Sequence, residues 1–240
     1  MMRWGAVSET GMVRLNNEDS LCINPALKLF AVADGMGGHV AGEVASRLAL
    51  EVLEASLEQF ITGGRDVPEA LSAAVREANR AIYERAAQDP QFKGMGTTLS
   101  ACVAQGSRLV VAHVGDSRIY LVRGQDIKQL TEDHSLVREL AKQGKITEDE
   151  SNSHPYRNVL TRALGTGTDL AVDSQVHLLQ EGDRLVLCTD GLTNLVSDEE
   201  ILARAGEGED PARMAGALAE LALSRGGTDN VTVIVVVIDA

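Results

Sequence analysis

Short apolar runs separated by turn residues recur along the chain, and each has about the length of a β-strand. The runs that predict strands are residues 29–33, 98–103, 108–114, 119–122, 183–188 and 231–238. Since they are distributed over most of the sequence, the pattern predicts that β-structure contributes much of the core.

Between these runs, apolar residues recur with the 3.6-residue period of an amphipathic helix. This period predicts helices over residues 41–61, 68–87 and 210–225. Asp210 is suited to cap the last of them, with Pro211 in its first turn and Gly226 as its stop signal. Residues 197–200, Ser-Asp-Glu-Glu, resemble a capping box that opens a further short helix.

The order of these elements favours an α+β fold. Two long helices follow one another early, strands dominate the middle, and another helix precedes the last strand. Strict alternation of strand and helix is absent, which argues against a doubly wound parallel sheet. Antiparallel sheets with helices outside fit the order better. No repeat or linker divides the chain, so we expect a single domain over residues 1–240.

Composition limits the partners of the protein. The 240 residues include 44% hydrophobic and 24% charged side chains, as in an ordinary globular protein. Lys plus Arg is 22 and Asp plus Glu is 35, which gives a net charge of −13. We therefore expect neither nucleic acid nor an anionic membrane as a partner, because both require a basic face. An acidic excess suits a cation-binding protein, but it also occurs simply because it keeps proteins soluble.

The cysteines and the chain start indicate a reducing compartment. Cys22, Cys102 and Cys188 lie far apart in apolar runs, which fits neither a disulfide framework nor a zinc site. The first residues lack the apolar stretch of a signal peptide, and the apolar run 231–238 is far shorter than a membrane span. We expect a cytoplasmic protein.

Several apolar runs deliver an aspartate at or near their ends, usually beside a glycine. For any one of these, an ordinary Asp-Gly turn is the simpler explanation. Together they suggest more, because carboxylates at the ends of buried strands lose water and repel one another unless cations neutralise them. Oxygen ligands of this kind suit Mg²⁺ or Mn²⁺, and an adjacent glycine lets a backbone carbonyl take part. The residues concerned are Asp34 with Gly35, Gly115 with Asp116, Asp190 with Gly191, Asp229, and the pair Glu18 and Asp19.

Two further side chains are candidates for catalysis. Arg14 lies four residues before Glu18 and could hold a phosphate near a metal pair, although a surface arginine is the simpler interpretation. His39, which follows two glycines, is the best placed histidine for a proton donor, although a surface or core histidine is the more common case. The histidines lack the spacing of a zinc site.

These motifs, in their order, resemble the metal-dependent protein Ser/Thr phosphatases of the type 2C family in the compact bacterial form. The resemblance covers essentially the whole chain. Its motifs are GMVRLNNEDS, FAVADGMGGHVAGEVAS, GMGTTLSACV, VAHVGDSRIYL, QLTEDHSLV, NVLTRALG, LVLCTDGLTNLVSDEEI and GTDNVTVIVV. It implies a sandwich of two antiparallel β-sheets with helices on both outer faces and a metal centre at one end.

The resemblance also assigns roles. It implies an enzyme that hydrolyses phosphoserine and phosphothreonine by direct attack of a metal-activated water, with two Mg²⁺ or Mn²⁺ ions and possibly a third. Arg14 matches the phosphate-binding arginine of the family. Asp34 bridges both ions, the Gly35 carbonyl binds one of them, and Asp190 and Asp229 complete the other. Asp19, and with less support Glu18, hold metal-coordinated waters, and Asp116 joins Asp190 at the third, weaker ion.

Two segments differ among members of the family. Many eukaryotic members read Asp-Gly-His-Gly-Gly, whereas this chain has Met36 at the third position and His39 after the glycines, so the proton donor is either His39 or a metal-coordinated water. Residues 137–157 correspond to the variable flap beside the active site. Their pattern suggests a mobile loop and helix, or simply a surface connection.

The expected partners are phosphorylated proteins, namely the substrates of a cognate bacterial Ser/Thr kinase, and the expected state is a monomer. One alternative is a phosphatase dedicated to a single regulator of the anti-anti-sigma type. We expect this less, because the 240 residues leave none for a sensor region. Another is a metal-binding pseudophosphatase that only binds partners, but the five matching aspartates argue against it.

Overall fold

The computed structural model describes residues 1–37, 41–147, 150–151, 154–206 and 210–239. His39 therefore lies outside the described residues, as do parts of the flap segment. Within the described ranges, no helix is both long and apolar enough to cross a membrane.

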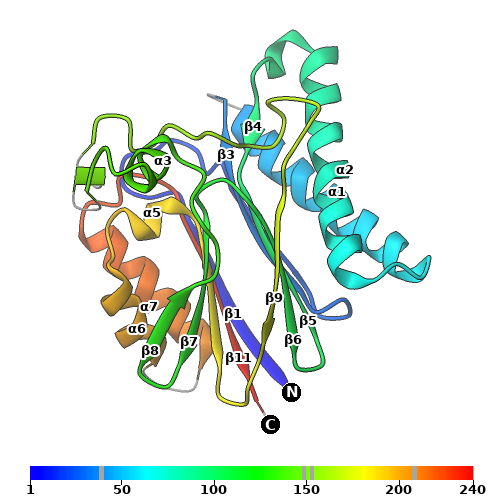
Figure 1. Ribbon diagram of the computed structural model, residues 1–240. Helices are drawn as coiled ribbons and strands as arrows, with labels where there is room; N and C mark the ends of the chain where they lie inside the picture. The colour runs from blue at the N-terminus through cyan, green and yellow to red at the C-terminus, as the bar shows by residue number, and fades with distance from the viewer. Residues whose placement is uncertain (38–40, 148–149, 152–153, 207–209, 240) are drawn as a thin grey trace.

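Two antiparallel β-sheets stack face to face (Figure 1). One follows the order β1-β11-β10-β7-β8, and the other follows β2-β3-β5-β6-β9, with the short β4 paired to the end of β3. The first sheet consists of β1 (Met2–Glu9), β11 (Val231–Ile238), β10 (Arg184–Cys188), β7 (Arg118–Arg123) and β8 (Asp126–Gln129). The second consists of β2 (Asp19–Asn24), β3 (Leu29–Met36), β5 (Leu99–Gln105), β6 (Arg108–Val114) and β9 (Asp173–Leu178), with β4 at Gly96–Thr97.

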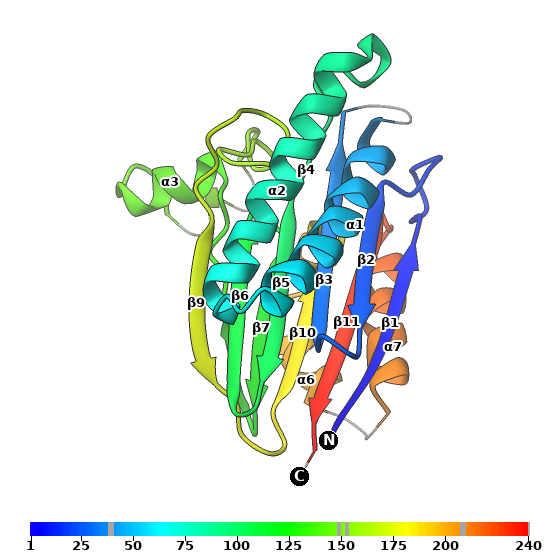
Figure 2. The ribbon, with the colours of Figure 1, turned by 90° about the vertical axis from the view of Figure 1, so that its right-hand side faces the viewer.

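Helices cover the outer faces of both sheets (Figure 2). α1 (Ala41–Thr62) and α2 (Val67–Gln88) lie on the sheet that contains β3, and α6 (Asp198–Gly206) and α7 (Pro211–Ser224) lie on the sheet that contains β11. The shorter elements are the 3₁₀-helix η1 (Pro90–Phe92) and the helices α3 (Leu136–Lys142) and α5 (Asp190–Thr193). The predicted sandwich with helices on both faces is thereby confirmed.

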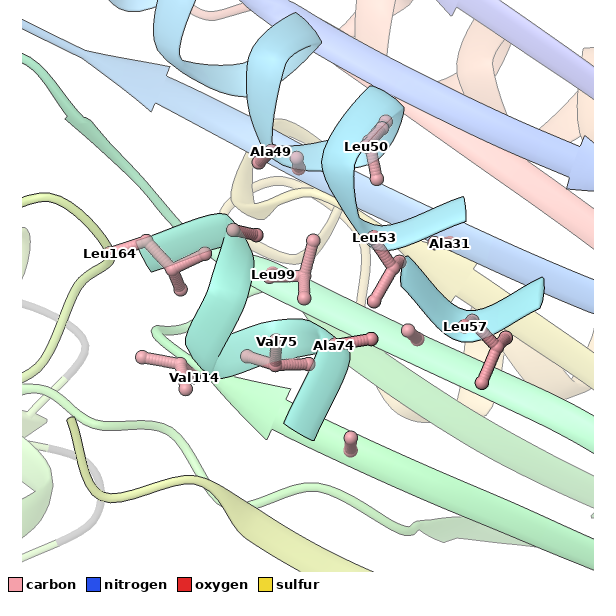
Figure 3. Packing of buried hydrophobic residues seen from close by; sticks show 14 of the residues in the cluster. Ala31, Ala49, Leu50, Leu53, Leu57, Ala74, Val75, Leu99, Val114 and Leu164 are labelled. Atoms are coloured by element: carbon pink, nitrogen blue, oxygen red, sulfur yellow. The ribbon is translucent and has the colours of Figure 1, made fainter. Parts of the chain in front are cut away.

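The core has three layers because the side chains of a strand alternate between its two faces. Between the sheets, Phe30 and Val32 from β3 meet Leu185 and Leu187 from β10, together with Ile234 from β11. Odd-numbered neighbours on β3, such as Ala31, point outward and pack against Leu53 and Leu57 of α1 (Figure 3). The matching outer layer of the other sheet packs against α6 and α7.

The predicted helix signals operate as expected. The Asp210 carboxylate accepts the backbone N–H of Ala212 at 3.0 Å, with Pro211 in the first turn of α7. The Glu200 carboxylate accepts the N–H of Ser197 at 3.1 Å, and the Ser197 hydroxyl accepts the N–H of Glu200 at 3.4 Å. This reciprocal pair is the predicted capping box at the start of α6.

Candidate metal centre

The antiparallel arrangement brings the acidic strand ends to one end of the sandwich. Asp19 begins β2 and lies opposite Asp34 in the β2–β3 register. Asp116 follows β6, Asp190 follows β10, and Asp229 precedes β11, the neighbour of β10. A strand that ends at this edge lies beside one that begins there, so five aspartates from distant parts of the sequence become neighbours.

Two oxygens of this cluster are buried and have no hydrogen-bond partner in the described part of the chain. Asp19 is 8% exposed, and one of its oxygens accepts the Thr189 hydroxyl at 2.8 Å. Its other oxygen, Oδ1, and Oδ1 of Asp190 are buried, and neither has a hydrogen-bond partner among the described residues. A buried carboxylate oxygen without a partner is costly, and a bound cation would offset this cost.

Proximity and burial together disfavour the charged forms. Burial raises the pKa of Asp34 well above its usual range, and the charges of Asp19 and Asp190 raise it further. Burial also raises the pKa of Asp19 to about 7, although hydrogen bonds from Thr232 and Thr189 oppose the shift. The pKa of Asp116 rises to about 8 and that of Asp190 rises too, in both cases chiefly through burial.

The two glycines that follow Asp34 and Asp190 are required by close backbone contacts. A Cβ added at Gly35 would lie 2.1 Å from the carbonyl oxygen of Gly42 in α1. A Cβ added at Gly191 would lie 1.9 Å from the carbonyl oxygen of Asn230. The glycines therefore let neighbouring backbone pack directly against the acidic strand ends, which holds the carboxylates in a tight frame.

Arg14 lies at the exposed rim of the cluster. Its Nη2 donates to Oδ2 of Asp229 at 2.7 Å, and its side chain is 52% exposed. The other oxygen of Asp229 accepts the N–H of Asn230 at 2.9 Å. Arg14 therefore lies beside Asp229, its guanidinium is open to an approaching anion, and its role in binding phosphate stays a prediction.

Glu18 and Asn230 hold the segment that carries Arg14. The Glu18 carboxylate lies against Gly42, where a Cβ would approach Oε2 to 2.2 Å, so its side chain reaches the first turn of α1. The side chain of Asn230 accepts the N–H of Glu18 at 2.8 Å and donates to the carbonyls of Thr10 and Asn16 at 2.8 and 2.9 Å. The sequence analysis did not identify Asn230, although it directly follows the predicted ligand Asp229.

A second group of residues that the sequence did not reveal supports Asp34. The Thr98 hydroxyl accepts the N–H of Asp34 at 2.9 Å and lies 2.6 Å from the hydroxyl of Ser117. Ser117 directly follows Asp116, so this buried hydroxyl pair ties two predicted ligands to one another. Thr98 lies in the motif GMGTTLSACV, but nothing in that motif indicated a contact with Asp34.

The donor set fits hard divalent cations. Among the described residues, no group of three or more His, Cys, Asp or Glu side chains is already arranged to hold a metal ion, and Arg14, Thr189 and Asn194 donate hydrogen bonds to some of the carboxylate oxygens. The candidate ligands are oxygens alone, two of them are buried without partners, and the repulsion within the cluster calls for positive charge. These are the requirements that Mg²⁺ or Mn²⁺ meets.

A cleft of about 1320 Å³ opens beside this end of the sandwich. Asp116, Asp190, Asp229 and Arg14 line it on one side, and residues of the flap segment, among them Arg157, line it on the other. The helix α3 lies in the flap segment, where the sequence suggested a loop and a helix. The N–H of Leu136 donates to the carbonyl of Val159 at 2.8 Å, which joins the two ends of the segment. The cleft has room for a phosphorylated peptide segment.

Comparisons with known proteins agree with this geometry. The family model described as protein phosphatase 2C matches residues 13–221. The chain is 46% identical to the serine/threonine protein phosphatase PstP of Mycobacterium tuberculosis over 98% of its length, but it spans only 45% of that relative. It is 38% identical to the serine/threonine phosphatase stp of Listeria innocua, covering 95% of the chain and 93% of the relative.

A solved structure is similar over the full chain. It is the catalytic domain of the serine threonine protein phosphatase PstP in complex with 2 manganese ions. Its sequence is 41% identical, the TM-score is 0.88, and the match covers 100% of this chain and 99% of that one.

Proposed function

This chain belongs to the protein phosphatase 2C family, and we propose that it is a metal-dependent protein Ser/Thr phosphatase, with residues 1–240 acting as one catalytic domain. The observation that carries the proposal is the pair of buried, unpaired carboxylate oxygens of Asp19 and Asp190, in an acidic cluster whose Asp190 lines a cleft together with Arg14. Such a site fits a pair of divalent cations and the phosphate of a monoester.

We assign the metal ligands as follows. Asp34, whose carboxylate interacts with all four other aspartates, would be a ligand of the ions together with the Gly35 carbonyl, and Asp190 and Asp229 would supply further ligands. Asp19, which already accepts the Thr189 hydroxyl, holds water at the ions, and Asp116 with Asp190 supports a third, weaker site. When bound, Mg²⁺ or Mn²⁺ neutralises phosphoryl charge and activates a water for direct attack on phosphorus.

The remaining side chains bind and position the substrate. Arg14 offers a planar guanidinium that can make paired hydrogen bonds to phosphate oxygens, and its present bond to Asp229 keeps it beside the metal ligands. Glu18 and Asn230 fix the segment on which it stands. Proton transfer to the leaving alkoxide is assigned to His39 or to water in the site.

The cleft and the family support phosphoproteins as substrates. We propose that these are substrates of a bacterial Ser/Thr kinase, that the enzyme works in the cytoplasm and that it is a monomer. Neither the dedicated regulator phosphatase nor the pseudophosphatase has a specific observation in its favour, because all five aspartates meet at one end of the fold.

The test is hydrolysis of p-nitrophenyl phosphate and of a phosphothreonine peptide by purified protein. We expect activity with Mn²⁺ or Mg²⁺, loss of activity in EDTA and recovery on adding the metal back. Arg213→Ala, a change at a 90% exposed side chain of α7, is the matched control and should behave like wild type. Full activity after exhaustive chelation would overturn the proposal.

A further inference from the structure

The turn that presents Asp116 has a conformation that needs support. Gly115, just before Asp116, has a φ of +112°, a value that favours glycine. A Cβ at this position would also lie 2.6 Å from Cβ of Thr98. The position of Asp116 therefore depends on a backbone conformation at Gly115 that glycine can adopt, but to which glycine alone is not restricted.

His134 clamps this glycine from both sides. The backbone N–H of Gly115 donates to Nδ1 of His134 at 3.1 Å, and the backbone N–H of His134 donates to the carbonyl of Gly115 at 2.7 Å. His134 is 6% exposed, so water cannot readily replace these bonds. A residue 19 positions away in the sequence thus determines how the turn before Asp116 is held.

The surroundings of His134 fix which ring nitrogen carries the hydrogen. Because a backbone N–H can only donate, Nδ1 of His134 must accept, and the hydrogen lies on Nε2. Nε2 lies 3.2 Å from Oδ2 of Asp173, which accepts its hydrogen, and 3.3 Å from Nη1 of Arg162; because that nitrogen can only donate, it bonds the other oxygen of Asp173, at 2.9 Å. Burial lowers the pKa of His134, which agrees with a neutral ring.

His134 also joins this turn to both ends of the flap. The next residue, Ser135, caps α3 by accepting the N–H of Arg138 at 3.3 Å. On the far side of the flap, the N–H of Thr161 donates to the carbonyl of His134 at 2.8 Å. One buried residue therefore contacts the Asp116 turn and the start and end of the segment that lines the opposite side of the cleft.

We propose that His134 is a positioning residue: its Nδ1 holds Gly115 so that Asp116 faces the cleft, and its backbone holds the base of the flap to the same turn. The consequence for catalysis rests on the proposed function, because it assumes that Asp116 serves a metal ion. The clamp itself does not, and it can be measured without activity.

Two substitutions separate the two nitrogens of the ring. In His134→Asn, the amide oxygen takes the place of Nδ1 and can still accept the N–H of Gly115. In His134→Gln, the amide nitrogen takes the place of Nε2 and can still donate to Asp173, but no acceptor remains for Gly115. If the clamp matters, Asn should preserve function better than Gln, although Gln is closer to histidine in length.

Hydrogen exchange at the Gly115 amide is the readout that requires no catalysis. We expect exchange about tenfold faster in His134→Gln and near wild type in His134→Asn, in line with the loss of one buried hydrogen bond. In parallel, kcat/KM should fall about tenfold in the Gln variant and the Mn²⁺ concentration for half-maximal activity should rise, while the Asn variant stays within about threefold.

His177→Gln is the matched control, since His177 lies on the neighbouring strand β9 opposite Leu109, at the other end of β6 from Gly115; it should match wild type. If His134→Gln does not fold, Asp173→Ala tests the same contact, because it removes only the acceptor of Nε2. We expect exchange at the Gly115 amide to become faster than in wild type, by less than tenfold. Equal exchange at Gly115 in the Gln variant and wild type, or equal losses in the Asn and Gln variants, would overturn the proposal. Inactive wild-type protein would instead overturn the proposed function.

Discussion

Strand β10 has an aspartate just beyond each end, and the two differ both in exposure and in pairing: Asp183 is fully buried, whereas Asp190 is half-buried, with its Oδ1 shielded from solvent. Asp183, just before the strand, is fully buried, and its two oxygens accept Nε and Nη2 of Arg123, each at 2.7 Å. A third bond comes from the backbone N–H of Gln180 at 2.7 Å. Asp190, just after the strand, has one oxygen bonded to the side chain of Asn194 and the other unpaired.

The difference shows that burial alone does not identify a functional carboxylate. Asp183 has a counter-ion and a full set of hydrogen bonds, so it stabilises the corner between β10 and its neighbours. Asp190 has no such counter-ion: burial and then the charge of Asp229 raise its pKa, although hydrogen bonds with Asp34 and Asn194 and the charge of Arg14 oppose the shift. An unpaired carboxylate oxygen among other carboxylates is the feature on which the proposed metal centre rests.

The largest expected effect is a loss of activity on substitution of Asp190, the aspartate that follows β10. Asp190→Asn should lower kcat/KM by on the order of 10³-fold, because a ligand charge of the metal pair is lost. The same change should leave the metal-free protein as stable as wild type or more so, since it relieves repulsion with Asp34 and Asp229. Steady-state kinetics and thermal unfolding in EDTA measure the two quantities. If Asp190→Asn lost stability but kept its activity, Asp190 would have a structural role like that of Asp183.

Asp183→Asn should show the opposite pattern. It removes the counter-ion of Arg123 and should cost about 2–4 kcal/mol of unfolding free energy, less than for a fully buried pair because Arg123 is 40% exposed. At a temperature where the variant stays folded, its kcat/KM should remain within about twofold of wild type. Urea unfolding followed by kinetics checks both, and an inactive but stable variant would contradict the assignment.

Arg14→Ala tests whether the exposed arginine beside Asp229 binds the phosphate of the substrate. One charge-assisted contact to phosphate is lost, so kcat/KM should fall about 10–100-fold, mainly through KM, since the phosphate charge is already present in the bound substrate. Arg14→Lys should recover part of the loss, because it keeps the charge but not the paired geometry. Wild-type kcat/KM for Arg14→Ala on a phosphothreonine peptide would return this residue to the role of an ordinary surface arginine.

The smallest expected effect is a pH dependence of the metal-free protein. The folded-state pKa values of Asp19 and Asp116, about 7 and about 8, lie above those of the unfolded chain. Their stabilisation is therefore present at low pH and is lost as pH rises through these values, about 1–3 kcal/mol between pH 6.5 and 8.5. His113, with a pKa lowered to about 4 by burial, opposes this trend only below about pH 6.5.

Saturating Mn²⁺ should abolish that pH dependence, because ions replace protons at the same oxygens. Urea unfolding at several pH values, with and without Mn²⁺, makes the measurement. Unfolding free energy that rises with pH in the metal-free protein would contradict the picture of a repulsive carboxylate cluster.

The sequence predicted the buried strands better than the exposed ones. β11 is buried along nearly its whole length, and the apolar run 231–238 predicted its bounds to the residue. β1, β8 and β9 were missed because much of each lies exposed and its apolar positions do not form a run. Edge strands gain their stability from pairing with a neighbour, which a local pattern does not record.

In the candidate site too, local sequence patterns predicted some residues and could not predict those that depend on distant contacts. Asp34, Asp116, Asp190 and Asp229 stand at the ends of apolar runs, so the sequence could point to them, and the fold brings them together. Residues that support them could not be found in this way, because their partners are far off in sequence: Thr98 accepts the N–H of Asp34 from 64 positions away. His39 lies outside the described residues, and its role stays a prediction.

Calorimetric titration of Mn²⁺ into metal-free wild-type protein and into Asp190→Asn tests the central claim most directly. We expect at least two ions bound per wild-type chain and loss of this binding in the variant, although both proteins remain folded. Equal Mn²⁺ binding by the two proteins, or none by the wild type, would contradict the claim that the unpaired carboxylates at this end of the sandwich form a metal centre.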